Sequence, residues 1–388
     1  MAKITDLKTF PLSIPREVPY LGVLTERDEA KDGGLFVRGG NRSVYSVADH
    51  CVLVRIETDG GTVGWGECVA VVAPSIAATA IRELVEPLLR GRDPNDVMAI
   101  GEDLYDAMRV RGFFGGFWGD ALAAVDIALW DLKGKLAGQS IATLLGGRRT
   151  DRIPAYVSGL PEATREKRIA LALRWQERGF GAFKFPAAMD PAQMVEEIAA
   201  LRAALGPEAT LLCDMHWRNT PGEAVRIIRK LEAHDLALAE APVAPEDIAG
   251  QAHVRDRVNT PVAIGEELRT VFEYRPRFEA GCMDVVQPEM GRTGLSQFWL
   301  IGQMARAFNC EVMPHASIGI GIFQAASLQV AAALPHCRLH EYQHSVFDRN
   351  LRFVTGDMAC REGRFHVPEG PGLGVEPRES VFAYTLSS

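Results

Sequence analysis

Three carboxylates stand at equal intervals along the middle of the chain. They are Asp214, Glu240 and Glu266, and each closes a short apolar run such as Leu211-Leu212-Cys213. Continuous apolar runs of this length are typical of strands buried on both faces, as in a parallel sheet. The carboxyl ends of such strands lie at one edge, where like charges repel unless a cation lies among them. Because hard oxygen ligands favour Mg²⁺ over zinc, the pattern predicts a magnesium site.

Five further ionisable residues fall at or near the ends of neighbouring apolar runs: Lys184, His216, Asp284, His315 and Glu341. A base at such a site can take a proton next to a carboxylate while the cation holds the developing charge. We assign the base to His315, held by Asp284, and assign the acid that protonates a leaving hydroxyl to His216. A packed wall residue is the alternative for His216. Lys184 would add positive charge, and Glu341, if protonated through a raised pKa, would donate a hydrogen bond to a carboxylate oxygen.

The elements that must position these residues alternate from Arg152 onwards. A strand followed by a helix, repeated at intervals of roughly 30 residues, is the period expected for a (β/α)₈ barrel. Active sites of such barrels lie at the carboxyl ends of the strands. The expected strands cover residues 153–157, 182–185, 210–214, 236–240, 261–266, 283–287, 311–313 and 340–342.

The region before the barrel has a different pattern. Residues 50–58 alternate, Asp59-Gly60-Gly61 marks a turn, and 62–67 follow, which predicts a β-hairpin. Apolar spacing of three and four predicts helices over 75–89, 94–108 and 120–145. A polar, glycine-rich segment over 16–43 is expected to form a lid whose arginines meet an anionic substrate, with disorder as the alternative. The aromatic segment 112–118 is either domain packing or a pocket wall.

Composition excludes several classes of protein. A length of 388 residues suggests two domains. The net charge is −8 and no basic patch is apparent, so nucleic acid is not an expected partner. Seven scattered cysteines without CxxC spacing fit reduced thiols and a cytoplasmic location. No apolar run is long enough for a membrane span or a signal peptide.

The chain resembles the mandelate racemase branch of the enolase superfamily over nearly its whole length. The resemblance is carried by Gly64-Trp65-Gly66-Glu67, by Val125-Asp126-Ile127-Ala128-Leu129-Trp130-Asp131-Leu132-Lys133-Gly134-Lys135 and by Leu144-Leu145-Gly146-Gly147. It implies an α+β capping domain over residues 1–125, a TIM-like (β/α)₇β barrel over 126–345, and a segment over 346–388 that returns to the capping domain. It also implies the roles of Mg²⁺ ligands for Asp214, Glu240 and Glu266, a His315–Asp284 dyad and an electrophilic carboxyl at Glu341.

Two local sequences favour one activity within that family. Racemases and cycloisomerases of the family usually carry Lys-x-Lys, whose second lysine is a base, where this chain has Lys184-Phe185-Pro186. The second face of the substrate therefore lacks its usual base. Asp214-Met215-His216 resembles the Asp-x-His of sugar-acid dehydratases, in which the histidine acts as an acid on the leaving hydroxyl.

We therefore expect an Mg²⁺-dependent dehydratase that converts a sugar acid, either an aldonate or an aldarate, into a 2-keto-3-deoxy acid. The alternatives are a lactone cycloisomerase or racemase of the same superfamily, and a non-catalytic binding protein on a retired enzyme fold. The resemblance further implies a homo-oligomer, from dimer to octamer.

Overall fold

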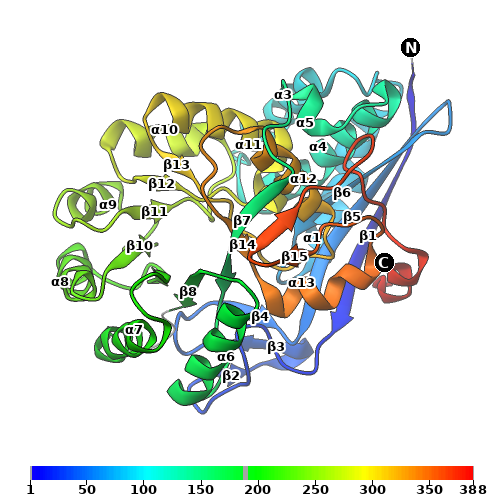
Figure 1. Cartoon of the computed structure of the whole chain (residues 1–388). Coiled ribbons are helices and arrows are strands. Elements are labelled where there is room, and N and C mark those ends of the chain that lie inside the picture. Colours follow the sequence, from blue (N-terminus) through cyan, green and yellow to red (C-terminus); the bar gives the residue numbers. More distant parts are fainter. Residues whose placement is uncertain (1, 187–190, 388) are drawn as a thin grey trace.

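An antiparallel sheet of three strands opens the chain in the computed structural model, which describes residues 2–186 and 191–387 (Figure 1). Its strands are β1 (Ile4–Pro15), β5 (Ala48–Thr58) and β6 (Val63–Val69), in the order β1-β5-β6. Gly61 takes a φ of 77° in the turn between β5 and β6, and its N–H donates to the Thr58 carbonyl. The predicted hairpin is therefore confirmed.

Helices cover this sheet. They are α1 (Pro74–Ala80), a π-helical turn η2 (Ile81–Val85), α2 (Glu86–Leu89), α3 (Val97–Arg109), α4 (Gly116–Ala137) and α5 (Ile141–Leu144). The single helix expected over 120–145 is divided, because Gly138 adopts the left-handed conformation that ends α4. Ser140 then caps α5 by accepting from the Thr143 N–H.

Two glycines of β6 let α4 lie directly against the sheet. A Cβ built on Gly64 would overlap the carbonyl oxygen of Ala128, and one on Gly66 would overlap that of Ala124. The motif Gly64-Trp65-Gly66-Glu67 is thus explained by the close approach of a strand to a helix backbone.

The second region is a barrel of parallel strands surrounded by helices (Figure 1). Among the described residues its strands are β7 (Arg152–Ser158), β8 (Ala182–Pro186), β9 (Thr210–Asp214), β10 (Leu236–Glu240), β11 (Val262–Ile264), β12 (Val285–Val286), β13 (Glu311–Val312) and β14 (His340–Tyr342). They pair in the order β14-β7-β8-β9-β10-β11-β12-β13. The barrel closes through a bridge between Val312 and Cys337, and the predicted fold class is confirmed.

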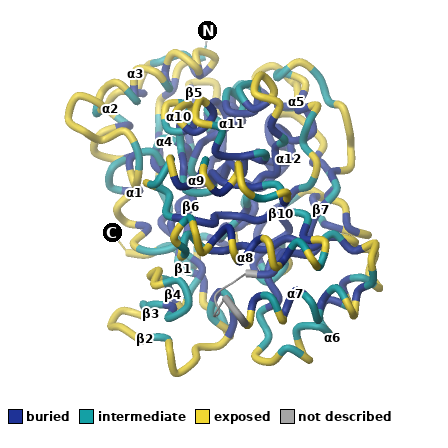
Figure 2. The backbone as a smooth tube through the Cα atoms, turned by 90° about the vertical axis from the view of Figure 1, so that its left-hand side faces the viewer, coloured by how far each residue is buried: buried dark blue, intermediate teal, exposed yellow. Residues whose placement is uncertain are grey.

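The barrel helices form its outer ring, and its interior is packed. The helices are α6 (Arg165–Glu177), α7 (Pro191–Leu205), α8 (Pro221–Glu232), α9 (Ile248–Arg255), α10 (Val271–Ala280), α11 (Met290–Ala307) and α12 (Ile322–Ala333). Inside, one apolar cluster takes side chains from successive strands, among them Tyr156, Leu212, Leu238 and Met313. Figure 2 shows these strands as the dark, buried centre, while the outer helices carry exposed residues on their outward faces.

The remaining segments join the two regions. The loop after β1 contains β2 (Glu29–Ala30), η1 (Asp32–Gly34), β3 (Leu35–Val37) and β4 (Val44–Ser46). The tail contains α13 (His344–Asn350), η3 (Leu351–Phe353), β15 (Cys360–Arg361), β16 (Arg364–His366) and η4 (Glu379–Tyr384). β16 pairs with β7, whereas the Leu386 N–H donates to the Pro11 carbonyl of β1. The tail therefore contacts both regions, and the domain limits given above remain a prediction.

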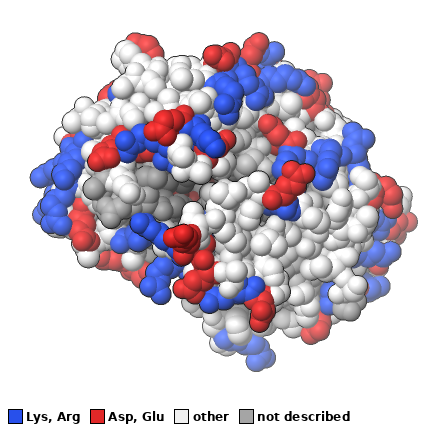
Figure 3. Space-filling view, turned by 90° about the horizontal axis from the view of Figure 1, so that it is seen from below, with Lys and Arg blue, Asp and Glu red and all other residues white. Residues whose placement is uncertain are grey.

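The surface carries charges of both signs. Figure 3 shows Lys and Arg interspersed with Asp and Glu on one face, without a large field of either sign. No helix in the described part of the chain has the length and apolar content needed to cross a bilayer. All seven cysteines are free thiols.

Candidate active site

The three predicted metal ligands lie at the carboxyl ends of adjacent strands. Asp214 ends β9, Glu240 ends β10, and Glu266 follows β11 after Gly265. Gly265 has a φ of 127°, and a Cβ there would collide with the Tyr274 ring, so the residue has to be glycine. The Tyr274 hydroxyl donates to the Gly265 carbonyl at 2.7 Å, which fixes the turn that presents Glu266.

Burial makes this group of carboxylates electrostatically costly. Glu240 is fully buried and Asp214 nearly so. Burial, reinforced by repulsion from Glu266, raises the pKa of both Asp214 and Glu240 despite the nearby Lys184 ammonium. Such a set of hard oxygen donors is stabilised by a cation, and it fits the divalent ion that the sequence predicts.

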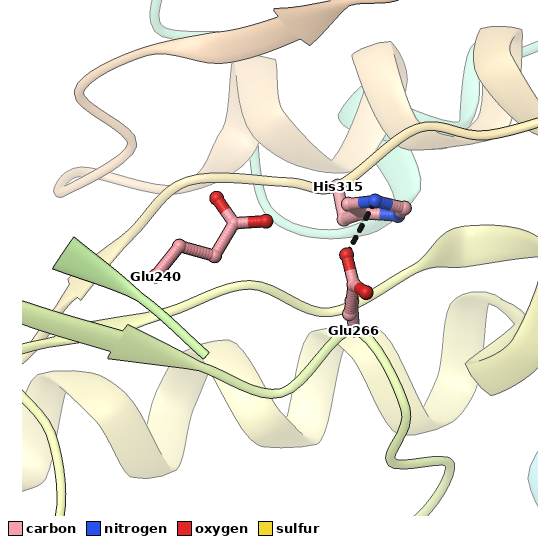
Figure 4. A group of neighbouring side chains, drawn as sticks. All are labelled: Glu240, Glu266 and His315. Carbon is pink, nitrogen blue, oxygen red and sulfur yellow. Dashed lines mark ion pairs between the residues drawn. The ribbon is translucent and has the colours of Figure 1, made fainter. Parts of the chain in front are cut away.

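Cationic side chains already contact two of the three carboxylates. Lys184 Nζ lies 2.8 and 3.1 Å from the two oxygens of Glu240, and Gln287 Nε2 donates to Glu240 at 2.7 Å. His315 Nε2 lies 2.6 Å from Glu266 Oε2. Figure 4 shows the carboxylates of Glu240 and Glu266 and the His315 ring around one space.

Glu240, Glu266 and His315 each offer an atom within 4.8 Å of the others, the spacing that a single metal ion can bridge. Asp214 lies outside this tighter group. Its Oδ1 accepts from the His216 N–H at 2.9 Å, so its carboxylate remains on the same rim of the barrel.

The predicted partner of His315 is wrong. Asp284 precedes β12, so it lies at the amino end of that strand, opposite the site. Its carboxylate accepts from Arg255 at 2.8 Å and from the Val262 N–H at 3.0 Å. These contacts give Asp284 a structural role in joining α9 to the sheet.

Glu289 takes the place that Asp284 was expected to fill. Its Oε2 lies 2.7 Å from His315 Nδ1, and the residue is fully buried. β12 spans only Val285–Val286, so Gln287 and Glu289 are the residues at its carboxyl end. The sequence does contain a signal for this correction. The pair Val285-Val286 marks the centre of the strand, which places Asp284 before the strand and Glu289 after it.

His315 is held by carboxylates on both ring nitrogens. Burial alone would lower its pKa, but Glu266, Glu341 and Glu289 raise the pKa well above its ordinary value. The imidazolium is therefore favoured in this arrangement, where it supplies positive charge to Glu266.

Glu341 lies in the middle of β14 and behaves as an ionised acceptor. The Ser158 hydroxyl donates to Oε1, and the Ala316 N–H donates to Oε2 at 2.9 Å. Burial would raise its pKa, but the charges of His315 and Lys184 outweigh burial and lower it. The raised pKa expected for a protonated Glu341 is thus wrong for this arrangement.

His216 leaves the strand direction that the sequence suggested. It has a φ of 47°, as part of a tight turn that follows β9. Its Nε2 lies 3.2 Å from Asp214 Oδ2, and its ring lines the same cavity as His315. Burial lowers the pKa of His216 to about 4.

The cavity above these residues has a volume of about 620 Å³. The segment expected to be a lid contributes Tyr20, Leu21, Asn41, Arg42 and Ser43 to its wall, and Tyr45 of β4, just after that segment, lines it as well. Tyr20 also packs on Ile318 of the barrel and Val346 of α13, and its hydroxyl accepts from Gln343 Nε2 at 3.1 Å. This segment therefore covers the strand ends.

Of the arginines predicted to meet a substrate, only Arg42 lines this cavity. Arg38 is buried, and it donates to the carbonyls of Tyr20, Gly22 and Val23 and to Asp28. Arg38 thus holds the loop that carries Tyr20. Arg27 lines a separate, neighbouring cavity.

The aromatic segment 112–118 lies elsewhere. Phe114 and Trp118 line a second cavity of about 340 Å³ between α3, α4, α10 and α11, and neither lines the cavity above the strand ends. Of the two alternatives left open by the sequence, the pocket wall therefore applies to this second cavity.

Two family descriptions match the chain. Residues 42–146 match the N-terminal domain of mandelate racemase / muconate lactonizing enzyme, and residues 167–381 match the enolase C-terminal domain-like family. A D-galactarolactone cycloisomerase from Agrobacterium fabrum is 33% identical and covers 84% of this chain and 88% of its own length. A D-galactonate dehydratase family member from Streptomyces bingchenggensis is 32% identical over 88% of this chain and 90% of its own.

Solved structures agree with this assignment. A member of the enolase superfamily from Agrobacterium tumefaciens is 49% identical, with a TM-score of 0.95 over 99% of both chains. A racemase from Streptomyces coelicolor with bound magnesium is 25% identical, with a TM-score of 0.85 over 99% of this chain and 100% of its own.

Proposed function

Because this chain belongs to the mandelate racemase/muconate lactonizing enzyme family of the enolase superfamily, we propose that it is an Mg²⁺-dependent sugar-acid dehydratase. The proposal is carried by one observation: two histidines, His315 and His216, line one cavity with a buried set of carboxylates. Elimination of water needs a base and an acid, and this cavity offers a candidate for each.

The metal would be held by Asp214, Glu240 and Glu266. When bound, it would offset the negative charge that develops on the substrate carboxylate as the α-proton leaves. Glu266, which contacts His315 Nε2 at 2.6 Å, would then serve as a metal ligand and would leave this nitrogen of His315 free for proton transfer.

His315 takes the α-proton on Nε2. Glu289, 2.7 Å from Nδ1, keeps the other nitrogen protonated and stabilises the imidazolium that forms. Lys184, held between Glu240 and Glu341, adds positive charge beside the substrate carboxylate. Glu341 orients Lys184 and does not donate a proton.

His216 donates a proton to the departing β-hydroxyl, which leaves as water. The resulting enol becomes the 2-keto-3-deoxy acid. Burial keeps the pKa of His216 low, at about 4, so the proton has to be retained by the negative charge of a bound sugar acid.

That low pKa favours one second candidate, a lactone-opening or lactone-forming cycloisomerase, in which no hydroxyl has to be protonated as it leaves. The cycloisomerase from A. fabrum supports the same alternative. A racemase is disfavoured, because Pro186 stands where a second base would be needed.

A library of sugar acids with Mg²⁺ tests the proposal, with semicarbazide to detect 2-keto-3-deoxy products and EDTA as control. We expect a hit that EDTA abolishes. His315→Asn should abolish turnover while Mg²⁺ still binds, and His216→Asn should strongly impair a dehydratase but spare a cycloisomerase. Turnover of lactones alone would establish the cycloisomerase. Bound Mg²⁺ without activity on either class would indicate a non-catalytic binding protein.

A further inference from the structure

The wall of the catalytic cavity contains buried polar groups that the proposed mechanism does not use. A cavity of about 620 Å³ has the volume of ordinary small-molecule sites. The carboxylates, Lys184 and His315 account for one pole of a sugar acid, its C1 carboxylate. Glu267, from the loop after β11, and Arg292, near the start of α11, also line the cavity.

Glu267 has two buried oxygens that lack a hydrogen-bond partner among the described residues. A buried acceptor without a donor costs free energy, so native structures rarely leave one unsatisfied. Glu266, the preceding residue, contacts His315 Nε2 at 2.6 Å, whereas neither carboxylate oxygen of Glu267 has a comparable contact among the described residues. Two acceptors at one place suit two hydroxyl groups on adjacent carbons.

Arg292 is the complementary group. Its Nε is buried without an acceptor, and within the described ranges Arg292 makes no ion pair. It does not pair with Glu267, although both line the same cavity. The fold therefore holds a donor and an acceptor apart, and a ligand with hydroxyls and an anionic group would satisfy both.

The balance of charge around the cavity points the same way. Arg42 and Arg218 also line it, and in the described part of the chain neither makes an ion pair. The C1 carboxylate of a sugar acid is already matched at the metal pole. A guanidinium binds a carboxylate through two parallel hydrogen bonds, so the remaining arginines suit a second carboxylate. Among them Arg292 alone has a buried unpartnered nitrogen, because Arg42 and Arg218 are exposed.

We propose that the substrate is an aldarate, a sugar acid with a carboxylate at each end, whose second carboxylate binds Arg292 and whose hydroxyls donate to Glu267. This inference rests on the proposed function and narrows it to one of the two classes of sugar acid.

Matched pairs of acids test it: galactonate with galactarate, and gluconate with glucarate. We expect the wild-type enzyme to show a kcat/KM at least 10-fold higher for the aldarate, since one charge-assisted bidentate contact provides about 10- to 100-fold discrimination. Arg292→Gln should remove that preference through KM, with aldonate kinetics changed less than about three-fold.

Arg218→Gln is the matched control, because Arg218 lines the same cavity but is exposed. It should leave the preference intact. Arg292 also lines the cavity between α3, α4, α10 and α11. If Arg292 only supports the structure around that second cavity, Arg292→Gln should lower kcat/KM equally for both acids and should lower Tm. Equal losses of kcat/KM would therefore overturn the inference.

Glu267→Gln should raise KM for both members of a pair, because a carboxamide offers one acceptor in place of two. Calorimetric titration of galactarate into the Mg²⁺-loaded His315→Asn variant, with and without Arg292→Gln, measures binding without turnover. A wild-type preference for aldonates, or binding that Arg292→Gln leaves unchanged, would overturn the aldarate assignment while the dehydratase proposal stands. Tight galactarate binding without turnover of any acid would instead contradict the dehydratase.

Discussion

At the scale of single residues, the site is organised by which carboxylate contacts which ring nitrogen of His315. Glu266 lies 2.6 Å from Nε2 and Glu289 lies 2.7 Å from Nδ1. The first contact can be exchanged for a metal, whereas the second comes from a buried carboxylate whose other oxygen has no hydrogen-bond partner among the described residues. Glu289 is therefore the residue that we expect to orient the base.

Glu289→Gln should lower kcat by about 100-fold or more, because the imidazolium loses its compensating charge. Asp284→Asn should change kcat less than about three-fold, since Asp284 contacts Arg255 at the opposite end of the strand. Steady-state kinetics on the substrate found in the screen compare the two variants. Equal losses would return Asp284 to the dyad.

Asp126 on α4 gives a prediction of pH dependence away from the site. Burial raises its pKa to about 6, although Ser296 donates to it through both its hydroxyl and its N–H. In the unfolded chain the carboxyl loses its proton near pH 3.8, the ordinary value. The folded state therefore loses stability as pH rises between these two values and loses no more above about pH 6.

Asp126→Asn should remove this part of the pH dependence, because an amide can still accept from the Ser296 N–H without a charge. The shift corresponds to at most about 3 kcal/mol. Urea unfolding of both proteins at pH 4 and pH 7 measures the difference. We expect the free energy of unfolding of the variant to rise relative to that of wild type between pH 4 and pH 7. If the difference between the two proteins is the same at both pH values, the assignment is contradicted.

At the scale of elements, strand β6 connects the two regions. It packs against α4 of the capping region, and its residue Glu67 contacts the start of α12 of the barrel. Glu67, at the end of the Gly64-Trp65-Gly66 run, accepts from the N–H groups of Ile320, Gly321 and Phe323 at the start of α12. The same strand thus packs on a helix of one region and caps a helix of the other.

Gly66→Ala should destabilise the fold by about 3 kcal/mol or more, because its Cβ would overlap the Ala124 carbonyl of α4. Gly101→Ala is the matched control. Gly101 lies inside α3 with open space around a built Cβ, so alanine should stabilise that helix by about 0.5–1 kcal/mol. Thermal unfolding followed by circular dichroism should move in opposite directions for the two variants.

At the scale of the whole molecule, the buried carboxylates of the site are a source of instability that a divalent cation would relieve. Repulsion among them raises the pKa of Asp214 and Glu240 in addition to the effect of burial. A ligand that binds only the folded state stabilises it by about 2.7 kcal/mol at 100 times its Kd.

Mg²⁺ should therefore raise Tm in a concentration-dependent manner, and EDTA should reverse the effect. Glu240→Gln should remove most of the shift, whereas Glu279→Gln, on the outer face of α10, should leave it unchanged. Differential scanning calorimetry gives this readout without any substrate. An equal shift in both variants would place the metal elsewhere.

Much of this protein follows from its sequence alone. Apolar runs that end in Asp214, Glu240 and Glu266 predicted the parallel barrel, because the length and burial of a strand follow from the residues within it. The turn at Gly61 likewise reflects a local backbone requirement, whereas the glycines of β6 make room for α4, a helix distant in sequence.

Tertiary structure decided which side chains meet. Asp284 and Glu289 flank the same short strand, and only the true extent of β12 shows which of them faces His315. The ionised state of Glu341 depends on charges from β8 and β13, and the roles of Arg38 and Arg42 depend on how a long loop folds over the barrel. The pKa of Glu341 and the contacts of Arg38 and Arg42 depend on groups that are distant in sequence, so local sequence patterns do not determine them.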